Sequence, residues 1–270
     1  MNGLKFFSNL SSAQKIALSF LVVIGIGTLL LSLPISNQSG KFLDFIDAFF
    51  ISASCTCVTG LSTVVVSDTF SLFGQIVMLI LIQIGGLGFL TLMAFIISMT
   101  KDKLSIKEKT TMKEMLNNDR VLDMKKFIQD IIKYTFIFEG VGAFLISFTM
   151  IPKYGFFDGL FKSIFLAVSA FCNAGFDPLG GTSLQTYLNQ PFFIIIIMFL
   201  IILGGLGFAI WFELKDQLTL FFKKEINFKK LKKNLSFHTK VVLFVSLCLI
   251  DEHFIIASLL FLLSILKKFL

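Results

Sequence analysis

The chain has 270 residues, of which 56% are hydrophobic and only 15% are charged, and its formal net charge is +7 at pH 7. An average soluble domain carries about 25% charged residues, so this composition argues against a soluble core. The apolar runs do not alternate with polar residues, which argues against a β-barrel. The sequence therefore predicts an all-α polytopic membrane protein, in which the basic residues report topology rather than nucleic-acid binding.

The first predicted element is a transmembrane helix over Ile16–Leu33, which ends at Pro34. This run is long for the core of a signal peptide, and Leu31-Ser32-Leu33 is a poor cleavage site, so we expect the helix to be retained. A second apolar run, Leu43–Cys57, is too short to cross a bilayer, because a spanning helix needs about 20 residues. It is predicted to be a re-entrant helix.

A turn at Val58–Leu61 follows the short helix, and an unbroken spanning helix is predicted over Leu72–Met99. A short apolar helix that ends in Thr-Gly, just before a true span, is typical of a pore helix and its selectivity filter. Asp44 and Asp47 lie near the start of the short helix, where the helix dipole favours acidic side chains.

The same order of elements returns after a basic segment. Phe127–Ile151 is predicted to span, Phe157–Cys172 is a second short apolar helix, Asn173–Phe176 forms its turn, and Pro191–Phe212 spans again. Glu139 lies inside the first of these spans. A buried acid there is a functional candidate, and a structural partner for a neighbouring donor is an equally good interpretation.

An internal repeat supports this organisation. Gly175 lies 115 residues after Gly60, and the glycine-rich segment Leu203–Phe208 matches Ile84–Phe89 at a shift of 119 residues. These glycines favour close helix packing or a kink over a nucleotide-binding loop, since no strand precedes them. The predicted parts are a first span–pore loop–span repeat at 1–99, a basic loop at 100–126, a second repeat at 127–212, a second basic loop at 213–240 and an incomplete third repeat at 241–270.

Charge placement predicts the orientation. The two lysine-rich loops lie on one side in this topology, and the positive-inside rule places that side, together with the N-terminus, in the cytoplasm. Both turns are then approached from outside, where acidic residues outnumber basic ones. An acidic outer mouth raises the local concentration of cations. The acidic residues concerned are Asp44, Asp47, Asp68, Asp158 and Asp177.

The turns suit a filter for a dehydrated cation. Backbone carbonyls replace the water of such an ion when several turns point them at one axis, and glycine adopts the backbone angles that this requires. One glycine alone would be interpreted as a helix C-cap, but two in the same context favour a filter. The candidate filter residues are Val58, Thr59, Gly60, Leu61, Asn173, Ala174, Gly175 and Phe176.

Four motifs together resemble the TrkH/KtrB/HKT superfamily of potassium transporters, and within it the bacterial KtrB-type subunits. They are Val58–Leu61, Phe70–Phe89, Cys172–Asp177 and Leu235–Lys240. The resemblance implies uptake of potassium, or of potassium with sodium, through a filter of four pore loops in the cytoplasmic membrane. Gly60 and Gly175 fall on the filter glycines of the first two loops. A glycine in the first loop is associated in the family with potassium preference.

The resemblance also implies partners. Members form homodimers and bind a cytosolic ring subunit of the KtrA/TrkA type, which binds nucleotide and gates the pore. We therefore expect no cofactor on this chain, nucleotide only through the regulatory subunit, contact with membrane lipid, and no nucleic acid. Since the chain carries two repeats and the start of a third, a second copy or a separate half-transporter is expected to complete the filter.

The end of the chain departs from the family pattern. The third unit starts well at Phe237–Leu249 but then meets Asp251-Glu252-His253 in the middle of a span. Each acid at the centre of a membrane costs about 2.5–3.5 kcal/mol on insertion scales. We therefore expect the tail after about Ile250 to be foreign to the family, as a frameshift or a premature stop in the gene would make it.

Three functions are compared. The first is a pore-forming subunit for potassium uptake. The second is a non-conducting truncated remnant that only inserts in the membrane. The third, a membrane-embedded enzyme, is disfavoured, since His238 and His253 lie near no nucleophile or metal-ligand pattern.

Overall fold

The computed structural model describes residues 12–88, 124–223, 227, 230 and 233–248. These residues form helices and turns, with an isolated antiparallel bridge between Asn37 and Phe70. The all-α prediction is thus confirmed for the described part of the chain. The chain divides into two units, Met1–Gly205 and Leu206–Leu270.

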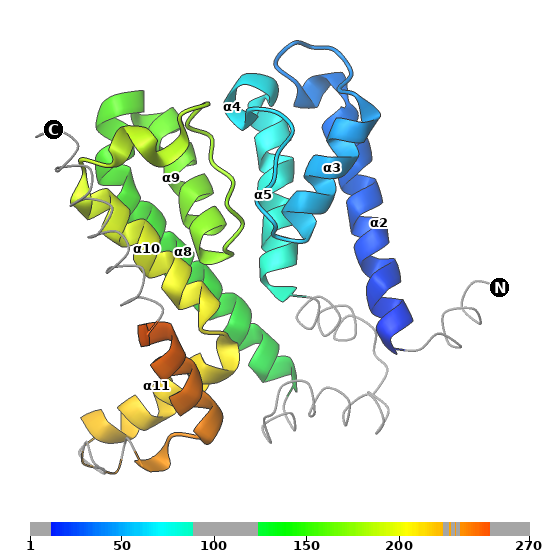
Figure 1. Cartoon of the computed structure of the whole chain (residues 1–270). Helices are drawn as coiled ribbons and strands as arrows, with labels where there is room; N and C mark the ends of the chain where they lie inside the picture. The colour runs from blue at the N-terminus through cyan, green and yellow to red at the C-terminus, as the bar shows by residue number, and fades with distance from the viewer. Residues whose placement is uncertain (1–11, 89–123, 224–226, 228–229, 231–232, 249–270) are drawn as a thin grey trace, which may run out of the picture. The chain divides into compact units, whose positions relative to one another are not determined.

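The first half of the larger unit is built around a short helix. Its elements are α2 (Ser12–Ser32), η1 (Pro34–Ser36), α3 (Phe45–Thr56), α4 (Val66–Thr69) and α5 (Leu72–Gly86). The short helix α3 packs against both α2 and α5 (Figure 1). Asp44 caps α3, because its carboxylate accepts a hydrogen bond of 3.0 Å from the backbone N–H of Ile46.

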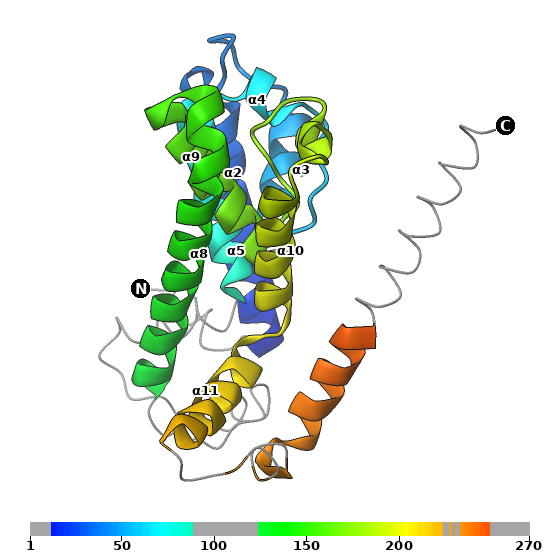
Figure 2. The ribbon, with the colours of Figure 1, turned by 90° about the vertical axis from the view of Figure 1, so that its left-hand side faces the viewer.

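The second half repeats this order. Its elements are α8 (Met124–Tyr154), α9 (Phe156–Phe171), η3 (Ser183–Tyr187) and α10 (Pro191–Gly205). The short helix α9 packs against α8 and α10 (Figure 2) and also contacts α5. Gly155, with φ of +84°, makes the tight turn between α8 and α9. Helix α8 continues through Pro152 to Tyr154, beyond the predicted end of that span.

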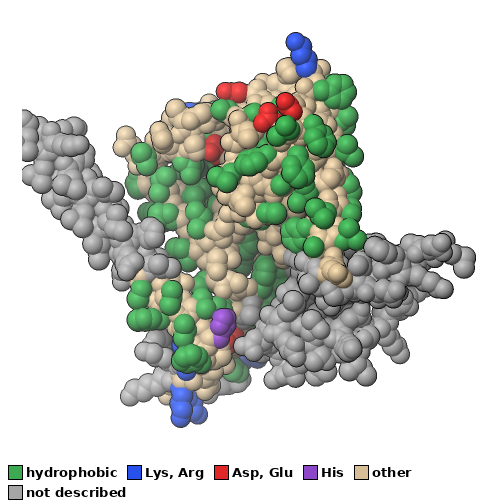
Figure 3. Space-filling model, turned by 45° about the vertical axis from the view of Figure 1, so that its right-hand side comes forward, with side chains coloured by type: hydrophobic (Ala, Val, Ile, Leu, Met, Phe, Trp, Pro, Cys, Tyr) green, Lys and Arg blue, Asp and Glu red, His purple; other side chains and the backbone are tan. Residues whose placement is uncertain are grey.

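Large apolar side chains fill the spaces between these helices and also cover the outside. The fully buried ones include Leu31, Ile51, Phe70, Met78, Ile82, Ile146, Met150, Phe165 and Phe193. Leu29 and Phe144 are more than 60% exposed, at 64% and 62%. Figure 3 shows hydrophobic side chains along the helices and several acidic ones near the top of the view. An apolar exterior of this kind suits lipid rather than water.

One helix of the described part, Gln129–Tyr154, is long and apolar enough to cross a membrane by itself, with 26 residues and a mean hydropathy of 1.6. Ala17–Ser32 and Leu72–Gly86 are apolar but shorter. A further candidate combines Pro191–Gly205 with the helix that follows it.

Two predicted helices end earlier than expected. The span predicted as unbroken over Leu72–Met99 ends at Gly86, and the span predicted over Pro191–Phe212 ends at Gly205. Gly88 and Gly207 have φ of +75° and +82°, a left-handed backbone that an α-helix excludes. The prediction of one continuous helix is therefore wrong at the same place in both repeats, while the prediction that these segments span the membrane stays a prediction. Residues 89–99 lie outside the described part.

The smaller unit contains α11 (Phe208–Phe222) and a helix over Phe237–Cys248. Ser236 caps the second helix, since its hydroxyl accepts a hydrogen bond of 3.2 Å from the N–H of Thr239. Glu213 of α11 accepts hydrogen bonds from the backbone N–H and hydroxyl of Ser236 and from the hydroxyl of Thr239. This carboxylate fastens the two helices together. The predicted acids of the tail lie outside the described residues.

Candidate functional site

The first candidate filter loop leaves α3 through a tight turn. Val58 has a left-handed backbone, with φ of 56°, and Gly60 has φ of 76°. Between them, the N–H of Thr59 donates back to the carbonyl of Ser54 at 3.0 Å. The chain therefore reverses over three residues while one hydrogen bond holds it to the end of the helix.

The second loop makes the same turn. Asn173 has φ of 58° and Gly175 has φ of 73°. The N–H of Ala174 donates to the carbonyl of Ser169 at 2.8 Å. Each of these residues lies 115 positions after its counterpart in the first loop. The repeat in the sequence is thus also a repeat of backbone angles and hydrogen bonds.

Left-handed backbone angles also occur two residues before each glycine, at Val58 and Asn173. Asparagine tolerates this region, but a β-branched residue such as Val58 is an outlier there, at a cost of about 1–3 kcal/mol. Such strain persists where surrounding structure fixes the backbone, often at functional sites. The sequence draws attention to the glycines but not to the backbone of Val58. Its alignment with Asn173 is the signal that could have found it.

The two loops touch at their glycines. A Cβ atom added to Gly60 would lie 2.8 Å from the carbonyl oxygen of Ala174, and one added to Gly175 would lie 3.2 Å from the Cα of Gly60. Both distances are shorter than ordinary van der Waals contact for a carbon atom. Glycine is therefore required here for two reasons, the left-handed angle and the approach of one backbone to the other.

The residues that follow the glycines differ in burial. Leu61 is 61% exposed, whereas its counterpart Phe176 is 4% exposed. A serine holds each of them. The hydroxyl of Ser54 accepts from the N–H of Leu61 at 3.0 Å, and the hydroxyl of Ser169 donates to the carbonyl of Phe176. The structure thus brings all eight candidate residues into two contacting loops, in which Ala174 and Phe176 of the second loop are buried.

The glycine-rich helix ends support the loops from behind. A Cβ on Gly85 would collide with the carbonyl oxygen of Thr56, and one on Gly204 would collide with the carbonyl oxygen of Phe171. These carbonyls belong to the last residues of α3 and α9. The close packing that the sequence leads us to expect of these glycines is confirmed.

Glu139 lies behind the second loop and is 4% exposed. Its Oε1 accepts a hydrogen bond of 3.0 Å from the Gln83 side chain and a longer contact of 3.8 Å from the thiol of Cys172. Helices α5, α8 and α9 therefore meet at this carboxylate, directly before Asn173. These contacts occupy Oε1, whereas Oε2 is buried and has no hydrogen-bond partner among the described residues, so the functional and the structural interpretation of Glu139 both stand.

These apolar helices and short connecting helices define the class of helical membrane proteins. Over residues 6–270 the sequence also matches the TrkH family, described as cation transport protein. The chain belongs to this family, which is one of transporters rather than enzymes. The family predicted from the motifs is confirmed.

Three relatives show the extent of the likeness. The chain is 36% identical over 247 residues to the potassium/sodium uptake protein NtpJ of Enterococcus hirae, covering 92% of this chain and 52% of that protein. It is 38% identical over 230 residues to the Ktr system potassium uptake protein B of Bacillus subtilis, covering 85% and 48%. The protein of the same name from Vibrio alginolyticus is 36% identical over 195 residues, covering 72% and 42%.

The comparisons also test the prediction that the tail after Ile250 is foreign to the family. The chain spans about half the length of the relatives it matches. The family match continues to residue 270. It therefore includes the tail after Ile250, and the expectation that this tail is foreign to the family is wrong.

Proposed function

We propose that this chain takes up potassium across the cytoplasmic membrane as a pore-forming subunit, with the loops at Val58–Leu61 and Asn173–Phe176 forming part of the selectivity filter. The observation that carries the proposal is the shared turn of the two loops and their contact at Gly60 and Gly175. The family of cation transport proteins and relatives named for potassium uptake support it.

Chemistry supports the same role. Potassium gives up its water only where oxygen ligands replace it, and filters supply these as rings of backbone carbonyls. Left-handed residues at alternate positions turn successive carbonyls in a way that an ordinary helix end does not. Non-helical backbone at membrane depth is tolerated where it lines an aqueous path. The loops would therefore be costly if they served only to end helices.

The filter needs further loops, since a ring of the potassium-channel type uses four. Leu61, which is 61% exposed, leaves the end of the first loop open to such a neighbour. A second copy of this chain, or a separately encoded half, supplies the remaining loops. In each copy the repeats are span–pore helix–span units, with the N-terminus and both lysine-rich loops inside.

Gating belongs to a partner in this proposal. A cytosolic subunit of the KtrA/TrkA type binds the nucleotide, and the chain itself carries no cofactor. Potassium is the transported substrate, held by the carbonyls of the two loops. Two of the relatives are named as members of a Ktr system, which supports a multi-subunit assembly.

The test is growth on low potassium. Bacteria without their own potassium transporters are given this chain, with and without a KtrA-like subunit. We expect growth that Gly60→Arg abolishes, because an arginine side chain has no space beside Ala174 and obstructs the ion path. Gly181→Arg is the matched control, since Gly181 has open space around its Cα and an ordinary φ.

Absence of growth with every variant, while the protein is detected in the membrane, supports the alternative of a non-conducting remnant. Growth that survives Gly60→Arg rejects the assigned filter but not transport itself. The two outcomes are told apart by measuring potassium uptake directly in the same cells.

A further inference from the structure

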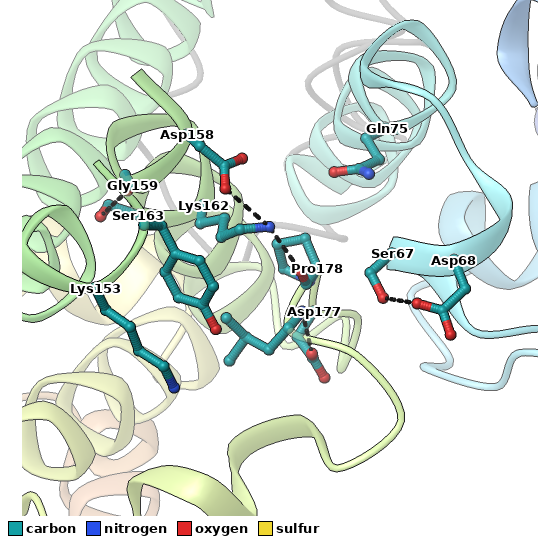
Figure 4. Close-up of polar contacts among 12 residues, drawn as sticks. Ser67, Asp68, Gln75, Lys153, Asp158, Gly159, Lys162, Ser163, Asp177 and Pro178 are labelled. Atoms are coloured by element: carbon teal, nitrogen blue, oxygen red, sulfur yellow. Dashed lines mark hydrogen bonds and ion pairs between the residues drawn. The ribbon is translucent and has the colours of Figure 1, made fainter. Parts of the chain in front are cut away.

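A lysine lies at the outer end of the second pore helix, where a cation pathway would not be expected to keep one. The Nζ of Lys162 in α9 donates to the carbonyl of Pro178 at 3.0 Å and lies 3.6 Å from the carboxylate of Asp158 (Figure 4). Its side chain is only 13% exposed. A solvated surface lysine would point its ammonium group into water, so this one is held in place.

The segment that Lys162 holds follows the filter directly. Phe176 is the last candidate filter residue, and Asp177 and Pro178 come next. Asp177 accepts hydrogen bonds from the N–H of Leu179 at 2.9 Å and from the hydroxyl of Ser183. Asp177 thus shapes the loop within itself, and Lys162 ties the shaped loop back to the helix that precedes the filter.

Two tyrosines, Tyr154 and Tyr187, also fix the loop after the filter to the neighbouring helix α8. The ammonium group of Lys162 lies 5.0 Å from the ring centroid of Tyr154, a distance at which a cation and a ring attract. The hydroxyl of Tyr187 donates to the hydroxyl of Tyr154 at 3.0 Å, and Lys153 donates to Tyr187 at 3.0 Å. Tyr187 ends η3, so the far end of the same outer loop is fixed to α8 as well.

The first repeat holds the chain after its loop by different contacts. The position 115 residues before Lys162 is Asp47. The chain after the first filter loop is held to η1 instead, where the N–H of Ser71 donates to the carbonyl of Ser36 at 2.9 Å and its hydroxyl to that of Ile35 at 2.6 Å. A basic residue therefore replaces an acidic one only in the repeat whose loop needs an anchor from the pore helix.

We propose that Lys162 is a positioning residue of the second filter loop, which fixes the exit of the loop through the Pro178 carbonyl. This inference rests on the proposed function for its effect on ion selection, but the anchoring itself does not. Asp158 compensates the lysine charge, so the residue fixes geometry without repelling cations from the mouth.

The first measurement is amide hydrogen exchange on the full chain in lipid nanodiscs, followed in peptides that cover residues 176–183. Lys162→Met should raise exchange there by about tenfold, since it removes one hydrogen bond from a charged donor. Lys162→Arg should stay near the wild type, because its guanidinium retains donors for the carbonyl. Lys41→Met, which changes an exposed lysine of the other outer loop, is the control.

The second measurement is competition between potassium and sodium in cells that take up potassium through the wild-type chain. We expect Lys162→Met to reduce the preference for potassium by about tenfold, with rescue by Lys162→Arg. Unchanged exchange in residues 176–183 of Lys162→Met overturns the proposal. Raised exchange with unchanged ion preference also overturns it, since the lysine then fixes the loop without positioning the filter. If the wild type transports nothing, the proposed function fails, and the exchange result still decides whether Lys162 is the anchor.

Discussion

Val58 carries the clearest sign of constraint at the level of single residues. Its φ of 56° is one that asparagine tolerates and valine does not, and the second loop has Asn173 at the same place. The two loops therefore differ in backbone strain although they share a shape. The first candidate loop thus keeps the shape of the second in spite of its strained residue.

Exchanging the two side chains tests this. We expect Val58→Asn to stabilise the protein by about 1 kcal/mol and Asn173→Val to destabilise it by about 1–3 kcal/mol, because strain leaves one loop and enters the other. Thermal unfolding of the purified protein in detergent measures both. If Val58→Asn destabilises as much as Asn173→Val, the left-handed backbone angle does not decide the stability of either variant.

The residues of the candidate filter loops show how much of the site can be predicted from the sequence. Gly60 and Gly175 are predicted from their place between a short helix and a span, and the structure brings them into contact. The contact itself is not predictable from the sequence, because it depends on how α5 packs against α9 rather than on either loop. The sequence likewise identifies the acid at position 139 but not its partners Gln83 and Cys172, which come from two other helices.

Two spans are predicted correctly at their starts, Leu72 and Pro191, but not at their ends. Asp44 falls near the start of the predicted short helix and caps α3 in the structure. Hydropathy, however, continues without interruption through Leu87 and Leu206, and a window that averages hydropathy does not register a single left-handed glycine. The predicted spans therefore run through the breaks at Gly88 and Gly207, although the repeated glycines indicate packing or kinking there.

The junction between α11 and the helix Phe237–Cys248 depends on an ionised carboxylate. Burial raises the pKa of Glu213, but hydrogen bonds from Thr239 and Ser236 outweigh that effect and hold the pKa below its ordinary value of 4.5. A lowered pKa means that the folded state favours the ionised form. The stabilisation is complete above pH 4.5 and is lost as the pH falls through the folded-state pKa, which lies lower.

We therefore expect Glu213→Gln to reduce the exchange protection of amides 237–248 at pH 7. The difference from the wild type should shrink as the pH falls below 4.5, where the wild-type carboxylate becomes protonated. Comparing both proteins at each pH cancels the intrinsic pH dependence of exchange. Ser236→Ala removes the N-cap instead, at a cost of about 1 kcal/mol. Part of the protection lost in Ser236→Ala should therefore stay lost at every pH. If the difference in protection between Glu213→Gln and the wild type does not change with pH, the role assigned to Glu213 is contradicted.

On the scale of the whole molecule, each candidate filter loop contacts one other loop. Gly60 and Gly175 contact one another, while Leu61 remains 61% exposed at the edge of the first loop. We expect a large apolar side chain such as Leu61 to be covered when further loops close the ring of a filter. The chain spans about half the length of the relatives it matches, and the proposed filter is one completed by further loops.

Co-expression separates the two ways of completing it. If two copies of this chain form one filter, a Gly60→Arg copy spoils every pair that it enters. With equal expression of the two copies at an unchanged total amount, and with random pairing, about a quarter of the pairs contain two wild-type copies, so potassium uptake should fall to about a quarter of that from the wild type alone. If a separately encoded half completes each filter, every wild-type chain works with its own partner and about half of the uptake remains. Co-expressed Gly181→Arg should leave uptake unchanged in either case. If uptake does not respond to the Gly60→Arg copy at all, both assemblies are contradicted, because each of them predicts that mutant chains lower the number of working filters.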